Sequence, residues 1–347
     1  MTRTTKQPRI LIIYTGGTIG MIEDPATHAL RPFNFDHLIE NVPKLRMLNY
    51  VIDNIQFDPP IDSTVMSPTH WEQIARAIAD NYRSYDGFVV LHGTDTMAYT
   101  ASALSFMLEN LSKPVIITGS QLPIGEVRTD GEENLITAVQ IAAEQARGEN
   151  RPMVQEVAIL FENYLWRGNR SSKTSADNFN AFKSHNYPSL AKIGLGIQYN
   201  PDTLARVANP APLRPHYAMD TNVAVVHLFP GMTVESLRWQ LSLPGLKGVV
   251  LRTYGAGNAP CTADFVEALQ EAIGRGVVVM NVTQCVNGSV CRRYAVAEPL
   301  EQIGVVSGHD ITPEAAITKL MYLFGRGFTP AEVRRALAQP LCGEMTI

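Results

Sequence analysis

A short apolar strand that ends in a glycine turn lies near the amino terminus and constrains the fold most. Residues 10–14, Ile-Leu-Ile-Ile-Tyr, are followed by Thr-Gly-Gly-Thr-Ile-Gly at residues 15–20. A continuous apolar run with branched side chains is typical of a parallel strand buried on both faces. The glycines favour a tight turn with exposed backbone amides. Because open parallel sheets bind ligands beyond the carboxyl ends of their strands, Thr15 and Thr18 are expected to present hydroxyls there.

A second segment repeats this arrangement and adds a carboxylate. The apolar run Gly-Phe-Val-Val-Leu at residues 87–91 ends in His-Gly-Thr-Asp-Thr at residues 92–96. From Asp95 to Asn110, apolar residues follow the spacing of one helical face, and another apolar run follows at 115–118. A strand, a helix and a second strand in this order predict a parallel pairing.

The same alternation predicts the fold class, which is α/β with two domains. Residues 1–196 are expected to form a larger N-terminal α/β domain, whose mostly parallel sheet carries the candidate site at the ends of its strands. Four prolines between Asn200 and Asp220 favour an extended linker at residues 197–220. Strands and helices then resume in a smaller parallel α/β domain at residues 221–347. Further strands are predicted at 157–161, 223–228, 248–251 and 277–280, and helices at 67–83, 234–242, 262–274 and from Thr312.

Composition excludes several classes of function. The 347 residues are 45% hydrophobic and 18% charged, with a net charge of −4, so no electrostatic footprint for nucleic acid or an anionic membrane is expected. No apolar stretch reaches the ~18 residues of a membrane helix, and the polar amino terminus does not resemble a signal peptide. The four cysteines lack metal-binding spacing, which favours thiols in a reducing cytoplasm. No metal or dinucleotide motif is present, so no cofactor is expected.

Four ordered motifs resemble the asparaginase and glutaminase family of threonine-dependent amidohydrolases. They are Thr-Gly-Gly-Thr-Ile at 15–19, His-Gly-Thr-Asp-Thr at 92–96, Arg-Gly-Asn-Arg-Ser-Ser-Lys at 167–173, and Tyr-Gly-Ala-Gly-Asn-Ala-Pro at 254–260. The last is similar to the bacterial cytoplasmic, or type I, branch. The resemblance runs from about Ile10 to about Phe324, nearly the whole chain.

The resemblance implies hydrolysis of L-asparagine by double displacement through a β-aspartyl ester. A threonine hydroxyl is a poor nucleophile until a base removes its proton. The family's nucleophile falls on Thr18, and its threonine–lysine–aspartate group falls on Thr94, Lys173 and Asp95. Structural alternatives remain for three of these residues. The Thr18 hydroxyl could cap the backbone of its own turn. Asp95 could interact favourably with the dipole at a helix N-terminus. Lys173 could be a solvated loop residue.

The resemblance also implies a substrate-binding set, which consists of Asp62, Ser63, Thr64, Thr94, Asp95 and Ser120. The loop that begins at Asp62 would hold the α-carboxylate and α-amino groups of the substrate. The backbone at Ser120 would contact the side-chain amide of the substrate. This chain departs from the family pattern at two places, and both bear on substrate preference and on turnover. Many relatives carry a tyrosine in the loop at residues 21–35, where this chain has none, and several carry aspartate at the position of Val65.

An effector site and self-association follow from the cytoplasmic branch of the family. Relatives of this branch bind a second asparagine between subunits, at positions that match Ser172, Arg252, Asn258 and Cys285. A guanidinium at a strand end offers two donors to a carboxylate, although Arg252 could instead bond backbone carbonyls. The resemblance implies a homo-oligomer, a dimer or a tetramer, in which the C-terminal domain of one subunit completes the site of its neighbour.

Three other functions stay open on the sequence. The amidase subunit of a tRNA-dependent amidotransferase shares these loops, although such subunits usually carry an added amino-terminal region. A preference for glutamine would use the same chemistry. A weakly catalytic, amino-acid-binding regulator would explain the missing loop tyrosine.

Overall fold

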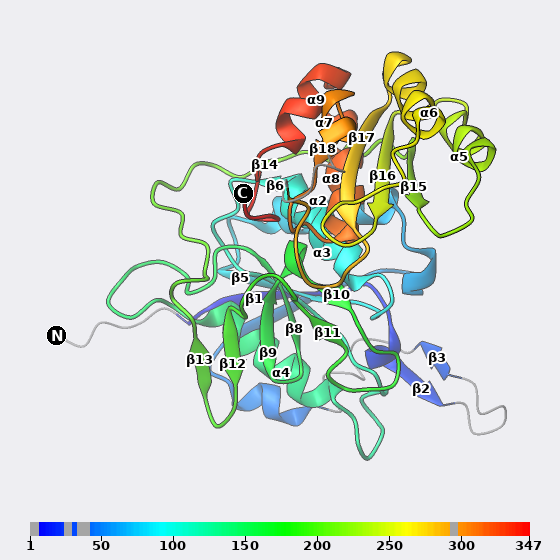
Figure 1. Ribbon diagram of the computed structural model, residues 1–347. Helices are drawn as coiled ribbons and strands as arrows, with labels where there is room; N and C mark the ends of the chain where they lie inside the picture. The colour runs from blue at the N-terminus through cyan, green and yellow to red at the C-terminus, as the bar shows by residue number, and fades with distance from the viewer. Residues whose placement is uncertain (1–6, 24–29, 33–41, 292–297) are drawn as a thin grey trace. The chain divides into compact units, whose positions relative to one another are not determined.

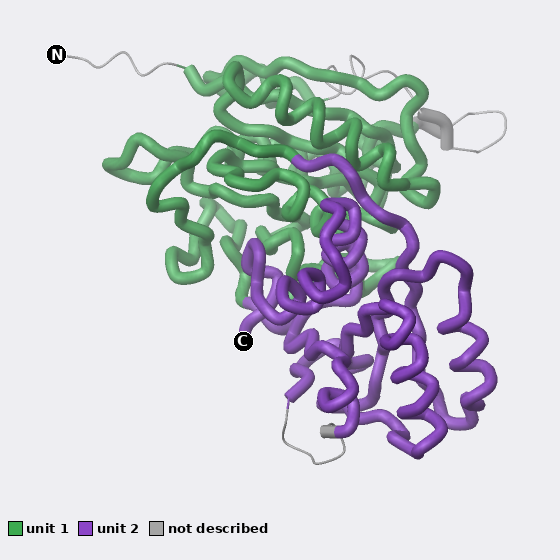
Figure 2. Tube along the Cα trace, turned by 90° about the horizontal axis from the view of Figure 1, so that it is seen from above, with its two compact units in different colours: residues 1–184, 188–215 green, residues 185–187, 216–347 purple. Residues whose placement is uncertain are grey.

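The chain divides into two compact units in a computed structural model that describes residues 7–23, 30–32, 42–291 and 298–347. Unit 1 consists of Met1–Ser184 and Pro188–Pro215, and unit 2 consists of His185–Tyr187 and His216–Ile347 (Figure 2). No helix in the described ranges has the length and apolar character needed to cross a bilayer.

An eight-stranded sheet organises unit 1 (Figure 1). Five of its strands run parallel, which confirms the predicted mostly parallel sheet. The strand order is β13 (Ile197–Tyr199), β12 (Ala191–Ile193), β9 (Tyr164–Arg167), β8 (Val157–Phe161), β7 (Val115–Thr118), β5 (Gly87–Leu91), β1 (Arg9–Tyr14), β4 (Val51–Gln56). β9, β12 and β13 extend the sheet with antiparallel pairings.

The predicted strands at 10–14 and 87–91 are neighbours in this sheet. β1 lies between β4 and β5, with Ile10 opposite Gly87 and Tyr14 opposite Leu91. The side chains of residues 10–14 and 87–91 are all buried, as expected for strands covered on both faces. β4 was not predicted, because its sequence, Val-Ile-Asp-Asn-Ile-Gln, lacks a continuous apolar run. An edge strand tolerates such polar residues.

Three long helices cover the sheet of unit 1. Figure 1 shows α2 (Pro68–Asn81) and α3 (Met97–Met107) on one face and α4 (Gly131–Ala143) on the other. Pro68 occupies the first turn of α2 as predicted, but the Ser67 hydroxyl contacts His70 Nδ1 at 3.2 Å and makes no capping bond to the helix backbone. Helix α3 ends before the predicted Asn110, because the chain next forms β6 (Leu108–Glu109).

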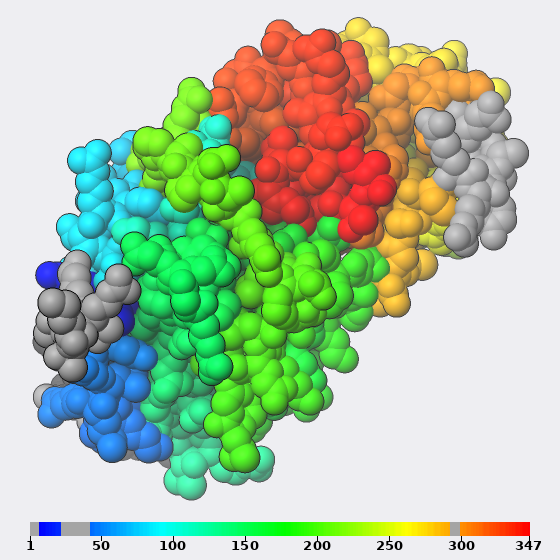
Figure 3. Space-filling view, turned by 90° about the vertical axis from the view of Figure 1, so that its left-hand side faces the viewer, coloured from blue at the N-terminus to red at the C-terminus, as the bar shows by residue number. Residues whose placement is uncertain are grey.

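The segment expected as a linker, residues 197–220, contributes strands to unit 1 up to Pro215. Besides β13, it forms β14 (Arg214–Pro215), which pairs antiparallel with β6. In Figure 3 this yellow-green segment lies on the surface against the cyan residues. Smaller hairpins in unit 1 are β2 (Met21–Glu23) with β3 (Leu30–Pro32) and β10 (Ser172–Lys173) with β11 (Phe182–Lys183).

Unit 2 contains the predicted second parallel sheet. Its strand order is β15 (Val223–His227), β16 (Gly248–Thr253), β17 (Val278–Thr283) and β18 (Val306–Ser307), with parallel pairings throughout. α5 (Val234–Leu241) and α6 (Ala263–Gly274) pack together beside the sheet, and Leu237, Leu251 and Phe265 share their hydrophobic core. The remaining helices are α7 (Glu298–Gln302), α8 (Pro313–Gly325) and α9 (Pro330–Leu337).

A buried ion pair fixes the C-terminal segment within unit 2. Lys319 Nζ on α8 lies 2.7 Å from Glu344 Oε1, and both side chains are fully buried. Lys319 also donates to the carbonyls of Leu337 and Gln339, while Glu344 accepts from backbone amides of the turn before it. The pair therefore satisfies its buried charges, as such pairs must.

A buried histidine links two helices of unit 1 to the end of β5. Trp71 Nε1 of α2 donates to Thr100 Oγ1 of α3 at 2.9 Å, and that oxygen lies 2.8 Å from His92 Nε2. His92 Nδ1 lies 2.7 Å from the Gly93 carbonyl oxygen. The His92 side chain is fully buried, and this burial lowers its pKa from 6.5 to about 4.

His92 should make the stability of unit 1 depend on pH. Between pH 6.5 and pH 4 the unfolded chain binds a proton at His92 that the folded chain excludes, so the free energy of unfolding falls by roughly 3 kcal/mol as the pH drops. Urea unfolding at a series of pH values, followed by tryptophan fluorescence, measures this loss. A His92→Asn variant should show a shallower fall than the wild type. Equal slopes for the two proteins would contradict a buried, neutral His92.

Candidate active site

Three loops meet at the carboxyl ends of β1 and β5 with no side chain between their backbones. Gly16 and Gly17 after β1 have φ angles of 131° and 93°, which favour glycine. A Cβ atom on Gly16 would lie 2.2 Å from the Ile61 carbonyl oxygen, and one on Gly17 would lie 2.5 Å from the Gly93 nitrogen. A Cβ atom on Gly93 would lie 2.5 Å from Ser63 Oγ. The predicted glycine turn therefore packs against both other predicted loops.

The two threonines of the glycine turn have different environments. Thr15 is buried, and its hydroxyl donates to the Leu91 carbonyl at 2.8 Å, so it joins the ends of β1 and β5 rather than facing a ligand. Thr18 begins a short 3₁₀ turn, Thr18–Gly20, and is half-buried. Within the described part of the chain, its hydroxyl makes no hydrogen bond. Of the two, Thr18 is the one whose hydroxyl is available to a substrate.

The predicted threonine, aspartate and lysine form one hydrogen-bonded group. Lys173 Nζ lies 2.8 Å from Thr94 Oγ1 and 2.6 Å from Asp95 Oδ1. The Lys173 side chain is 19% exposed and that of Asp95 is 59% exposed, so the ammonium is shielded while the carboxylate reaches the surface of unit 1. An ammonium in this position lowers the free energy of negative charge that develops on either oxygen.

Lys173 reaches this group from a different part of the chain. It lies on β10, where it pairs with Phe182 of β11. The centroids of the Phe182 ring and of the Phe161 ring on β8 are 4.9 Å apart. Just before β10, Gly168 packs against α3, and a Cβ atom there would lie 3.0 Å from the Ala101 Cβ atom. The sheet and α3 thus place the lysine opposite Thr94.

Gln121 is a site residue that the sequence analysis missed. Its Nε2 donates to the carbonyl oxygens of Ala176 and Asn178 at 3.2 and 3.0 Å, which identifies that atom as the amide nitrogen. Its Oε1 therefore faces Thr94 Oγ1, which donates to it at 3.3 Å. Gln121 thus orients the Thr94 proton and ties the loop after Lys173 to the site. Its position directly after Ser120, beyond β7, was the available signal.

The predicted substrate-binding residues line the same set of loops. Asp62 accepts a hydrogen bond from Thr64 N at 2.9 Å and so caps the turn that carries Ser63. Ser63 is buried beside Gly93, and its carbonyl accepts from Thr96 Oγ1 at 2.7 Å. Asp62 and Val65 also line a cavity of about 620 Å³ between this loop and α2.

Ser120 belongs to a loop that a buried carboxylate shapes. The Ser120 hydroxyl donates to the Leu122 carbonyl at 2.6 Å. Asp130, at the start of α4, accepts from the amides of Gln121 and Leu122 at 3.0 and 3.2 Å. Burial raises the pKa of Asp130, while these hydrogen bonds act in the opposite direction. Asp130 therefore holds the backbone on which Ser120 and Gln121 stand.

The predicted effector residues are divided between the units. Ser172 lies on β10 of unit 1, next to Lys173. In unit 2, Arg252 is near the end of β16, and Asn258 closes a turn through backbone hydrogen bonds with Tyr254. The Cys285 amide donates to Thr283 Oγ1 at 3.0 Å just after β17. Asn258 Oδ1 is buried and makes no hydrogen bond within the described residues.

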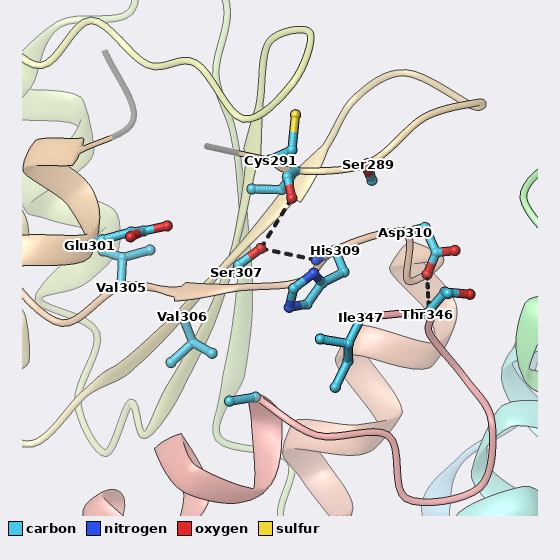
Figure 4. A pocket seen from close by; sticks show the side chains of 12 residues that line it. Ser289, Cys291, Glu301, Val305, Val306, Ser307, His309, Asp310, Thr346 and Ile347 are labelled. Carbon is cyan, nitrogen blue, oxygen red and sulfur yellow. Dashed lines mark hydrogen bonds between the residues drawn. The ribbon is translucent and has the colours of Figure 1, made fainter. Parts of the chain in front are cut away.

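Unit 2 also contains a cavity of about 800 Å³ that includes none of the predicted site residues (Figure 4). Polar atoms near it are bonded to one another. Ser307 Oγ donates to the Val290 carbonyl and accepts from His309 N, and Asp310 accepts from the Thr346 amide. Across the described ranges, no cluster of three or more His, Cys, Asp or Glu side chains is arranged to hold a metal ion.

Comparisons with known proteins identify the family of the chain. Residues 9–204 match the family "Asparaginase, N-terminal", and residues 222–337 match "Glutaminase/Asparaginase C-terminal domain". L-asparaginase 1 of Escherichia coli strain K12 is 42% identical, over 97% of this chain and 98% of its own length. The crystal structure of L-asparaginase I from Vibrio cholerae superposes with a TM-score of 0.90 at 40% identity, covering 99% of this chain and 100% of that one. A glutamyl-tRNA(Gln) amidotransferase component of Pyrococcus horikoshii is 32% identical over 98% of this chain and 77% of its own length.

The chain therefore belongs to the asparaginase family, and it is an enzyme of the L-asparaginase type, an amidohydrolase that acts on linear amides.

Proposed function

We propose that the protein hydrolyses L-asparagine to L-aspartate and ammonia, with Thr18 as the nucleophile. The observation that carries this proposal is the Lys173 ammonium, which is bonded to both Thr94 Oγ1 and Asp95 Oδ1 beside the glycine turn. Thr18 offers a hydroxyl without a partner in the described residues. The same Gly17–Gly93 approach that packs the two loops holds the Thr18 and Thr94 hydroxyls on adjoining backbones.

The reaction proceeds by two displacements. Thr18 Oγ attacks the side-chain amide carbon and loses its proton, the carbon–nitrogen bond breaks, and the nitrogen leaves as ammonia after taking up a proton. The product is a β-aspartyl ester on Thr18. Water then adds to the ester carbon, its proton returns to Thr18 Oγ, and aspartate leaves. Thr94, Lys173 and Asp95 transfer the protons, and donors near the glycine turn stabilise the oxyanion.

The substrate is held through its α-substituents. The Asp95 carboxylate, which is largely exposed, pairs with the α-ammonium group. The turn of Asp62, Ser63 and Thr64 holds the α-carboxylate region, and the backbone at Ser120 meets the side-chain amide. The loop at residues 21–35, which lies partly outside the described residues, contains no tyrosine. Thr18 is therefore activated without the tyrosine that this loop supplies in many relatives.

Removal of the Thr18 hydroxyl or of the Lys173 ammonium should abolish turnover. We expect Thr18→Ala and Lys173→Met to lower kcat by at least about 10³-fold, as when one member of a catalytic unit is removed. Ammonia release from L-asparagine by the purified protein measures it. Thr18→Ser, which keeps the hydroxyl, and Lys183→Met, on the neighbouring strand, serve as matched controls and should retain activity. Wild-type rates in Thr18→Ala and Lys173→Met would refute this mechanism.

A component of a tRNA-dependent amidotransferase is the second candidate, because the chain is similar to such a protein of P. horikoshii. A component of this kind would act as an amidase through the same loops. The same ammonia assay with L-glutamine separates the candidates, and it also tests a glutamine preference. Binding of asparagine without ammonia release would instead indicate a regulator.

A second asparagine is proposed to activate the enzyme at a site between subunits of a homodimer or homotetramer. The effector would contact Ser172, Arg252, Asn258 and Cys285. Two features of unit 2 support this. Asn258 Oδ1 is buried without a hydrogen bond in the described residues, and Trp239 and Phe229 are 71% and 54% exposed, more than large apolar side chains usually are. Ser172 adjoins Lys173, so one short strand would contact both sites, as coupling requires.

Cooperativity tests this effector site. The velocity of the wild type against asparagine concentration should be sigmoidal, and Arg252→Ala should make the curve hyperbolic. Arg275→Ala, which alters an arginine on unit 2 away from these residues, should leave the curve unchanged. Light scattering at the assay concentration should show an oligomer. A hyperbolic wild-type curve, a sigmoid that survives Arg252→Ala, or a fully active monomer would overturn the proposal.

We also infer a cytoplasmic location. The four cysteines, all within the described residues, are free thiols, as expected for a reducing compartment. A structure described as a probable cytoplasmic L-asparaginase from Campylobacter jejuni is 26% identical, with a TM-score of 0.80. Fractionation of the source cells would test the location, and recovery of the protein outside the cytoplasm would contradict it.

A further inference from the structure

A chain of three buried side chains in unit 1 ends on the carbonyl group directly before Thr94. It starts at Trp71 on α2, passes through Thr100 on α3 and reaches His92 at the end of β5, elements that Figure 1 labels. None of the three belongs to the catalytic or binding residues. Trp71 is 6% exposed, and Thr100 and His92 are 0% exposed. A buried polar network of this kind is costly unless every member is bonded, and then it specifies one arrangement.

The direction of each hydrogen bond follows from the atoms involved. The Gly93 carbonyl can only accept, so the 2.7 Å contact places the imidazole proton on His92 Nδ1. The indole Nε1 of Trp71 can only donate, so Thr100 Oγ1 accepts from it. The Thr100 proton is then directed to His92 Nε2, which accepts at 2.8 Å. The Gly93 carbonyl and the Thr100 hydroxyl therefore fix the imidazole in the tautomer with its proton on Nδ1, and Trp71 binds only the Thr100 oxygen.

The Gly93 carbonyl belongs to the peptide plane that carries the Thr94 nitrogen and leads to the Thr94 Cα atom. In the described part of the chain, His92 is the only partner of this carbonyl. The opposite faces of the loop are closely packed, since a Cβ atom on Gly17 would lie 2.6 Å from Gly93 Cα. A rotation of this plane would displace Thr94 Oγ1 from Lys173 Nζ.

We infer that His92 is a positioning residue for the reaction, because its Nδ1–H group fixes the Gly93–Thr94 peptide and thereby holds Thr94 against Lys173. The inference rests on the proposed function of Thr94 and Lys173. Its physical basis is that misplacing a reacting group by about 1 Å can lower the rate about 10²-fold.

Two substitutions at His92 separate its two hydrogen bonds. The amide nitrogen of His92→Asn can occupy the place of Nδ1 and donate to Gly93, whereas the longer His92→Gln side chain reaches the place of Nε2 and loses that donor. We expect His92→Gln to lower kcat for L-asparagine about 10²-fold, while His92→Asn stays within about tenfold of the wild type. Both variants should lose similar thermal stability, so the difference in kcat reports on the peptide plane.

Trp71→Phe serves as the packing control. It removes the first donor of the chain and disturbs the same core, but it leaves the Thr100–His92–Gly93 bonds in place. Its kcat should stay near that of the wild type although its thermal midpoint falls. If kcat instead follows the thermal midpoint across all three variants, or if His92→Gln keeps the wild-type kcat, His92 has only a structural role and the inference is wrong.

The tautomer gives a test that does not depend on activity. In ¹⁵N-histidine-labelled protein, the imidazole signal that disappears in His92→Asn should show the proton on Nδ1. A proton on Nε2 would overturn the inference even if the kinetics agree.

Wild-type protein that releases no ammonia from asparagine would overturn the proposed function, and this inference with it. Wild-type turnover with an unaffected His92→Gln overturns only the inference.

Discussion

The close approach of backbones at the carboxyl ends of β1 and β5 is the constraint on which the site depends. Gly16 and Gly17 leave no Cβ atoms between the turn, Ile61 and Gly93, and the Thr15 hydroxyl joins this turn to Leu91 at 2.8 Å. The loops that carry Thr18, Thr94 and Ser63 are thereby packed directly against one another. Any side chain at Gly17 would separate them, which explains why a small motif in the sequence is so informative about the fold.

The lysine proposed to act in catalysis comes from a separate segment of the chain. Lys173 lies on a short hairpin strand that Phe182 anchors to the sheet, and its ammonium is bonded to Thr94 and Asp95. Supporting residues then fix the orientation of the threonine. Gln121 Oε1 accepts a hydrogen bond from the Thr94 hydroxyl, and His92 holds the peptide before Thr94. The proposed reactive groups therefore depend on supporting side chains that are themselves hydrogen-bonded, as preorganised sites require.

The sequence predicted those features that periodicity and short motifs encode. Both buried central strands, helix α3 and the parallel sheet of unit 2 agree with the predictions. β4 escaped prediction because an edge strand needs no continuous apolar run. β13 and β14 escaped because both lie in residues 197–220, a segment whose prolines resemble those of a linker. For Gln121 the only signal was its position directly after Ser120, because its partners Thr94, Ala176 and Asn178 lie far away in the chain. His92 could not be assigned a role, because its hydrogen bonds to Gly93 and Thr100 depend on the folded loop and not on a sequence pattern. The roles of Thr18 and of the effector residues remain predictions from the family resemblance.

The identity of the residue that carries the acyl group is the central claim. Wild-type protein turning over saturating L-asparagine can be quenched in acid, digested and examined by mass spectrometry. The account predicts a β-aspartyl ester on Thr18 that is absent from Thr18→Ala. An ester on Thr94, with Thr18 unmodified, would contradict it and would make Lys173 the partner of the nucleophile itself.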